Sequence, residues 1–285
     1  IEKHIRKSYP ETNIISIDME RYEYTGIYSD KELVPFVEAH ARAGLNALFI
    51  DEVQEIASFE KGIRHFLSRG FDIYLSGSNA EVLSGELATM LTGRYVEIRI
   101  HPLCFKEFCN FHNQPENEKA LEQYLRYGGM PYLKNVNLND QIVFDYLKSL
   151  YQSVLLKDVV ARNQVKNVDF LERLVFYLSD NTGSILSAKN ISDFQQSQHL
   201  SLSPSVVLNY LRFMQQAFFI HKARRYDIHG KRLLEVGEKY YFNDIGIRNM
   251  LTGAGPDDIG KIIENQVYMH LVLKNYEVFV GKHYD

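Results

Sequence analysis

The sequence has 285 residues, enough for about two domains. Its 32 Lys and Arg residues against 36 Asp and Glu residues give a net charge of −4, which argues against a basic coat for non-specific nucleic-acid binding. No apolar run approaches the roughly 18 residues of a membrane helix, so no membrane partner is expected. Two cysteines favour a reducing compartment, and we expect a cytoplasmic protein.

The first part of the chain alternates short apolar runs with amphipathic segments. The predicted strands are residues 14–17, 45–50, 71–75 and 96–100, and the predicted helices are residues 30–43, 59–68 and 81–91. Gly44 is the expected stop of the first of these helices. Because helices separate the strands, the connections are crossovers, and we predict an α/β fold with a parallel sheet.

After residue 101 helical periodicity dominates. The predicted helices are residues 105–111, 116–126, 140–160, 168–178, 188–196, 204–219 and 262–274, and the predicted strands are residues 219–226, 239–242 and 277–280. Between residues 168 and 242 the order is helix, helix, long helix and hairpin. That order predicts a winged helix-turn-helix.

The segment that carries chemistry is a buried strand, Ala47 to Ile50, that ends in Asp51 and Glu52. Adjacent carboxylates in this place form a Walker B arrangement. Asp51 would lie at the carboxyl end of the sheet and order Mg²⁺ through water. Glu52 would orient the attacking water or act as its base. The alternative is a plain exit from strand to loop, with an acid as a cap.

Polar side chains also follow the next strand, where Ser78 and Asn79 are placed to sense a γ-phosphate and to hold the water. A further candidate is Arg94, just before the strand predicted at 96–100. Its guanidinium would stabilise developing charge, within its own site or across a subunit interface, which leaves a homo-oligomer open. The alternative is an exposed arginine at a strand edge.

Together these segments resemble a prokaryotic group of the AAA+ family of ATPases. The similar segments are residues 48–54, 75–79, 91–94, 102–108, 127–131 and 240–249, with Gly260, Glu264 and Asn265. The resemblance implies a P-loop NTPase-type core, a helical lid, a winged helix and the start of a nuclease-like α/β domain of the restriction-endonuclease type. It also implies an ATP hydrolase that uses ATP and Mg²⁺. The implied domains are residues 1–101, 102–165, 166–245 and 246–285, in that order.

One family motif is missing from the 285 residues, namely the P-loop, GxxxxGK followed by Ser or Thr. We expect it to precede Ile1; otherwise this polypeptide holds ATP poorly. Residues 255–262 fit GxxxxGK but lack the hydroxyl residue and put two carboxylates where phosphate would sit. Pro256 also removes a donor N–H, so this segment is rejected as a P-loop.

Four potential metal ligands lie close together in sequence: His101, Cys104, Cys109 and His112. The two cysteines would lie roughly 140° apart around a helix, which is too far to share a metal. Packing in the core is therefore favoured over zinc.

The long helix from Pro204 has a polar face with Asn209, Arg212 and Gln216, opposite its apolar packing face. Such side chains read base edges in DNA. The basic residues of the following segment are Lys222, Arg224, Arg225, Lys231 and Arg232, and they suit phosphates. The alternative is a lid module whose polar face meets solvent or the ATPase core.

The predicted function is that of an ATPase whose nucleotide state moves the lid and winged helix, with DNA or a protein as client. The alternative function is a non-catalytic module that binds DNA or proteins and does not hydrolyse ATP. Glu264 would be the first acid of a nuclease-like site, or a solvated helix residue. Nuclease activity is not predicted from these residues.

Overall fold

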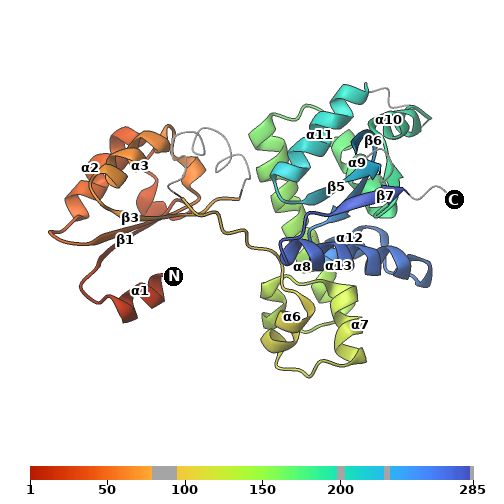
Figure 1. The fold of residues 1–285 in the computed structure, drawn as a ribbon, viewed down its shortest axis with the longest axis horizontal. Coiled ribbons are helices and arrows are strands. Elements are labelled where there is room, and N and C mark those ends of the chain that lie inside the picture. The colour runs from red at the N-terminus through yellow and green to blue at the C-terminus, as the bar shows by residue number, and fades with distance from the viewer. Residues whose placement is uncertain (79–94, 198–202, 228–231, 283–285) are drawn as a thin grey trace. The chain divides into compact units, whose positions relative to one another are not determined.

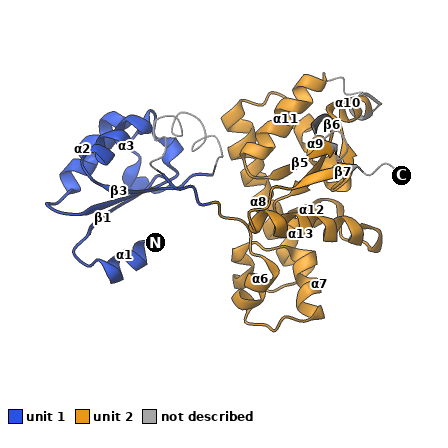
Figure 2. Cartoon of the chain, in the orientation of Figure 1, with its two compact units in different colours: residues 1–98 blue, residues 99–285 orange. Residues whose placement is uncertain are grey.

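The chain folds as two units, residues Ile1–Ile98 and Arg99–Asp285 (Figure 2). The computed structural model describes residues 1–78, 95–197, 203–227 and 232–282, and their elements run from α1 to β7 (Figure 1). The helix predicted at 81–91 lies outside the described residues.

The first unit is built on a parallel sheet in the order β1-β2-β3. Its elements are α1 (Glu2–Ser8), β1 (Asn13–Asp18), η1 (Tyr22–Tyr24), α2 (Asp30–His40), β2 (Asn46–Asp51), η2 (Val53–Glu55), α3 (Phe59–Ser68) and β3 (Asp72–Leu75). The register pairs Ile17 with Ile50 and Ile50 with Leu75. The prediction of a parallel sheet with crossover helices is confirmed for these three strands.

One face of this sheet carries the core of the first unit. Ile17 and Ile50 point to that face, where they pack with Leu33 of α2 and with Ile63 and Phe66 of α3. The helices α2 and α3 lie on the same side of the sheet (Figure 1). Since successive strand residues point to opposite faces, Asp51, the last residue of β2, points away from this buried face at the sheet's carboxyl edge.

Helix α2 ends at His40, three residues before the predicted end at Ala43. The Asn46 side chain accepts a hydrogen bond from the Arg42 N–H at 3.0 Å and donates to the Arg42 carbonyl at 2.8 Å. Asn13 donates to the His40 carbonyl at 3.0 Å. These two amides satisfy backbone groups that a longer helix would have paired, so the helix stops before Gly44.

The prediction of a strand at residues 96–100 is wrong. Residues 95–100 have no regular secondary structure, and Val96, Ile98 and Ile100 are 86%, 68% and 87% exposed. The alternation of apolar and polar residues is present, but a strand forms only when another strand pairs with it. In the described part of the chain, the sheet ends at β3 and no strand pairs with this segment.

The second unit is mainly helical. Its elements are α6 (Phe105–His112), α7 (Glu118–Tyr127), η3 (Pro131–Asn135), α8 (Asp140–Ser153), η4 (Val154–Ala161), α9 (Val168–Asp180), β4 (Ile185–Leu186), α10 (Ala188–Ser197), α11 (Pro204–Gln216), β5 (Ile220–Asp227), β6 (Arg232–Phe242), α12 (Ile245–Thr252), η5 (Pro256–Asp258), α13 (Ile259–Leu273) and β7 (Phe279–Lys282). The single helix predicted at 140–160 is α8 followed by a π-helical segment, η4.

A four-stranded sheet lies in this unit, in the order β4-β6-β5-β7. β6 is antiparallel to both β4 and β5, whereas β7 is parallel to β5 (Figure 1). The core is shared by helices and sheet: Leu147 of α8, Leu174 of α9, Leu211 of α11 and Phe242 of β6 are all buried in one cluster. Helices α9 and α11 and the strands β5 and β6 therefore form one packed body.

Candidate functional site

The chain turns sharply where β2 ends. Asp51 is the last residue of β2, and Glu52 adopts the left-handed conformation with φ 53° and ψ 48°. The Val53 N–H donates to the Ser76 carbonyl at 3.1 Å, and the Ser76 N–H donates to the Ile50 carbonyl at 3.0 Å. The ends of β2 and β3 are therefore bonded to each other at one edge of the sheet.

Two hydroxyl groups from the segment after β3 reach the two carboxylates. The Ser76 hydroxyl donates to Asp51 Oδ1, and the Ser78 hydroxyl donates to Glu52 Oε2 at 3.3 Å. Asp51 is exposed, whereas Glu52 is half-buried. An exposed carboxylate suits Mg²⁺, which takes one or two protein carboxylates and keeps several waters. The more enclosed Glu52 suits the orientation of a water molecule.

The structure thus brings together three of the predicted site residues, Asp51, Glu52 and Ser78. Asn79 and Arg94 lie outside the described residues. Ser76 is missing from the predicted set although it contacts Asp51. The register pairs Ile50 with Leu75, which places residue 76 beside residue 51. This neighbour is visible in the sequence only once the pairing of the two strands is known.

The second predicted surface lies on α11. Asn209 and Arg212 are exposed and Gln216 is half-buried, while Val207 and Leu211 on the other face are buried. The Arg212 guanidinium lies 5.5 Å from the centroid of the neighbouring Phe213 ring. The helix presents Asn209 and Arg212 to solvent and leaves both side chains accessible to a ligand.

The basic segment that follows α11 has fewer unpaired and accessible charges than its sequence indicates. The Lys222 ammonium is paired with Glu238 at 2.9 Å, so its charge is already balanced. Arg224 is exposed and Arg225 is half-buried, while Lys231 lies outside the described residues. Strand β7 also pairs with β5 along residues 224–227. Among the described basic side chains of β5, that of Arg224 is therefore the most accessible to a phosphate.

The cysteine and histidine group has structural partners. Cys109 is 1% exposed in a core cluster with Phe108, Ala120 and Tyr124. The His112 ring packs against Phe108, with 4.3 Å between ring centroids, and burial lowers the pKa of His112. These contacts account for Cys109 and His112 by packing.

Glu264 also has structural partners. It accepts hydrogen bonds from the Lys239 ammonium at 2.8 Å and from the Tyr241 hydroxyl at 2.7 Å. Next to it, the buried Asn265 bonds both the N–H and the carbonyl of Phe242, at 2.8 and 3.0 Å. The hydrogen bonds of both residues connect α13 to the end of β6.

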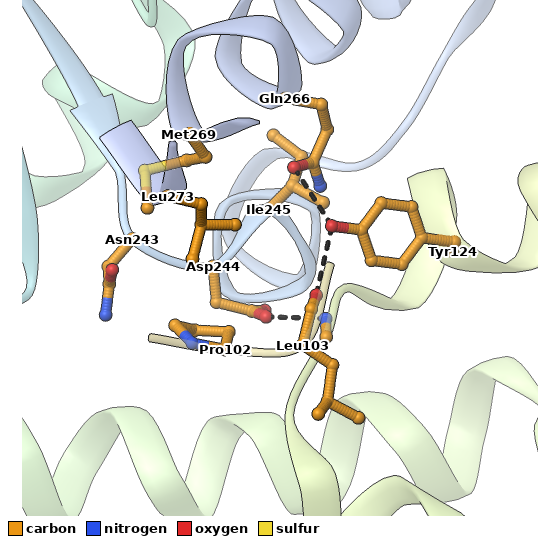
Figure 3. Close-up of a pocket in the computed structure, with 10 residues that line it drawn as sticks. Pro102, Leu103, Tyr124, Asn243, Asp244, Ile245, Gln266, Met269 and Leu273 are labelled. Carbon is orange, nitrogen blue, oxygen red and sulfur yellow. Dashed lines mark hydrogen bonds between the residues drawn. The ribbon is translucent and has the colours of Figure 1, made fainter. Parts of the chain in front are cut away.

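A small cavity in the second unit is lined by apolar side chains and by polar groups, some of which bond one another (Figure 3). Asp244 accepts a hydrogen bond from the Gly129 N–H at 2.7 Å, and the Tyr124 hydroxyl donates to the Leu103 carbonyl at 3.1 Å. Burial raises the pKa of Asp244 to about 6, although hydrogen bonds from the N–H groups of Gly129, Ile247 and Gly246 act in the opposite direction. The Gly129–Asp244 bond joins the end of α7 to the start of α12, and the Tyr124–Leu103 bond joins α7 to the segment before α6.

Comparison with known proteins finds similar sequences for both parts of the chain. Residues 1–109 match the model of a family described as an AAA domain, and residues 118–258 match a domain of unknown function (DUF8612). A Haemophilus influenzae protein described as uncharacterized is 32% identical over 277 residues, which are 95% of this chain and 69% of that protein. The chain belongs to the same family as this protein, and its N-terminal part is an AAA-type domain.

More distant proteins are also similar to this chain. An uncharacterized Methanocaldococcus jannaschii protein is 28% identical over 235 residues, and the match spans 79% of this chain but only 52% of that protein. The Walker-type ATPase PABY2304 of Pyrococcus abyssi has a similar fold, with a TM-score of 0.54 and 14% identity over 84% of this chain and 83% of that one.

The two candidate surfaces fall in different family matches. Asp51, Glu52 and Ser78 lie in the AAA-type domain, whereas α11 and β5 lie in the domain of unknown function. Among the described residues, no helix has the length and apolar character needed to cross a membrane.

Proposed function

We propose that this chain is part of an AAA-type ATPase that binds and hydrolyses ATP with Mg²⁺. The observation that carries the proposal is the pair Asp51 and Glu52 at the carboxyl end of β2, with Ser76 and Ser78 bonded to them. Ligands of open α/β sheets bind at this end of the strands. An AAA-type domain over residues 1–109 supports the same function.

In the proposed reaction Asp51 holds Mg²⁺, which neutralises charge on the phosphates when it is bound. Glu52 orients the water whose oxygen bonds to the γ-phosphorus as the bond to the ADP oxygen breaks, and it accepts the water's proton. Ser78 and Asn79 contact the γ-phosphate, and Arg94 stabilises its developing charge. The 285 residues contain no P-loop motif, so the proposal requires the full-length protein to supply that loop from outside them.

Replacing Glu52 with glutamine tests this function in the full-length protein. The amide keeps the size of the side chain but cannot accept the proton. Turnover of radiolabelled ATP should fall by about 10²- to 10⁴-fold. ATP binding should be retained, and Glu11→Gln, an exposed change before β1, should leave turnover unchanged. Equal turnover by wild type and Glu52→Gln would remove Glu52 from the mechanism.

We also propose that the nucleotide state is coupled to a winged-helix module in the second unit. The order α9, β4, α10, α11, β5 and β6 supports that module, because it is a set of three helices with three adjacent strands of the four-stranded sheet. The proposed lid, winged helix and start of a nuclease-like domain keep the ranges 102–165, 166–245 and 246–285. A protein client and a homo-oligomer belong to the same proposal.

A second candidate function is DNA binding by the module alone, without hydrolysis. The exposed side chains of Asn209, Arg212 and Arg224 favour it. If they contact DNA, affinity for a labelled duplex should fall steeply with salt, and Arg224→Glu should reduce the salt slope by about 1. Arg173→Glu, an exposed change on α9, is the matched control. Affinity that ignores both salt and the Arg224 change would dismiss this function.

A further inference from the structure

The half-buried Gln54, two residues after Glu52, has no role in the reaction proposed above. It lies in η2, and its side-chain Nε2 contacts Glu52 Oε2. Its other polar atom, Oε1, is buried and has no hydrogen-bond partner among the residues that the structure describes. A buried acceptor without a partner lowers stability, and each such group in a folded protein calls for an explanation.

The backbone conformation of Glu52, two residues before Gln54, is also unfavourable. Glu52 has a positive φ of 53°, a conformation that residues other than glycine seldom adopt. Strained backbone persists where its surroundings hold it in place, and it gathers at functional sites. Here the Val53 N–H to Ser76 carbonyl bond fixes the turn to the end of β3. Two unfavourable features, a strained Glu52 and an unsatisfied Gln54, therefore occur within three residues.

Two hydrogen-bond donors meet at the Glu52 carboxylate. Gln54 Nε2 and the Ser78 hydroxyl donate to the same oxygen, Glu52 Oε2, from the turn and from the neighbouring strand's end. Both of these hydrogen bonds end on Oε2 rather than on the other oxygen, Oε1. Two donors on one oxygen restrict rotation of the carboxylate and leave the opposite oxygen to receive a proton.

We infer that Gln54 is a positioning residue that holds the Glu52 carboxylate so that Oε1 faces the attacking water. The inference rests on the proposed function of Glu52 as the group that orients water. Gln54 acts through Glu52 and need not touch ATP. A purely structural glutamine would raise stability, whereas this one retains an unsatisfied acceptor.

The test is Gln54→Met in the full-length protein, because methionine has a similar length and lacks both polar atoms. The unfolding temperature should stay the same or rise, since the unsatisfied Oε1 is removed. The kcat for ATP should fall by about 10- to 100-fold, since a small misplacement of a reacting group has effects of that size. The KM for ATP should change less than about twofold, because the phosphate contacts are untouched.

A double-mutant cycle separates positioning from a general effect. In the Glu52→Gln background, Gln54→Met should cause no further fall in kcat, because the group that Gln54 positions is already disabled. Additive losses, or a lowered unfolding temperature together with the lowered kcat, would overturn the inference.

The two proposals fail in different ways. If Glu52→Gln loses turnover and Gln54→Met keeps the wild-type kcat, the positioning role is wrong and the ATPase function stands. If the full-length wild type has no turnover, or Glu52→Gln matches it, both proposals fall.

Discussion

Replacing Gly246 with alanine is expected to destabilise the second unit strongly. A Cβ atom at this position would lie 2.0 Å from the Tyr127 carbonyl oxygen and 2.5 Å from the Tyr127 carbonyl carbon. Both are backbone atoms at the end of α7, so no side-chain rotation relieves the clash. The change should lower the free energy of unfolding by about 3 kcal/mol or more, measured by urea denaturation.

The clash matters because several hydrogen bonds hold α7 and α12 together at this close approach. The Asn249 side chain donates to the carbonyls of Leu125 and Arg126 at 2.8 and 3.0 Å, which caps the end of α7. Asp244 caps the start of α12 through the Ile247 N–H at 3.2 Å and also accepts from Gly129 (Figure 3). Pushing the helices apart would break these bonds together.

A matched control is Gly260→Ala, at the start of α13. Among the described residues, and apart from its chain neighbours and the backbone of its own helix, no atom lies within 4 Å of the Cβ that this change would add. Alanine also favours helix over glycine, so stability should stay equal or rise by up to about 1 kcal/mol. If Gly246→Ala had the same free energy of unfolding as Gly260→Ala, the close approach of α7 and α12 seen in the structure would be contradicted.

Replacing Arg248 with methionine should also be strongly destabilising. The Arg248 side chain is fully buried and pairs with Asp258 at 2.8 Å. It also donates to the carbonyls of Ser179 and Gly253, both at 2.9 Å. Methionine would leave a poorly exposed carboxylate and two carbonyls without this donor. Removing one partner of a buried ion pair costs up to about 3–5 kcal/mol, and Lys261, 3.3 Å from the same carboxylate, offsets part of that loss, so chemical denaturation should show a loss below this limit.

The same pair predicts a dependence on pH. Hydrogen bonding by Arg248, with a smaller contribution from Lys261, lowers the pKa of Asp258. A carboxyl group with a lowered pKa in the folded state stabilises the protein above its unfolded pKa, about 4, and loses that contribution as the pH falls further. The acid limb of the wild-type stability curve should therefore be steeper than that of Arg248→Met.

Arg173→Met is the control for the loss of an arginine. Arg173 is also paired with an aspartate, Asp169, at 3.0 Å, but both side chains are more than half exposed. Surface pairs of this kind contribute about 0–1 kcal/mol. If the two variants lost equal stability, the burial of Arg248 would not be what makes its ion pair matter.

The local pattern of the sequence determined most of the first unit. Apolar runs predict the strands 13–18, 46–51 and 72–75 to within a residue or two, because strands buried in a parallel sheet need such runs. The same pattern places Asp51 and Glu52 at the end of a strand, since two polar acids end the buried run. These properties depend on neighbours along the chain, so the sequence shows them directly.

Only the tertiary structure decided which distant groups meet. Residues 96–100 have the alternation of a strand, yet they form none, because a strand also requires a partner. Ser76 contacts Asp51 because of a register between two strands, and Gly246 meets Tyr127 across more than 100 residues of sequence. Arginine side chains are mostly exposed, yet Arg248 is fully buried in the fold. Such contacts depend on the packing of remote segments, and no local pattern of residues encodes them.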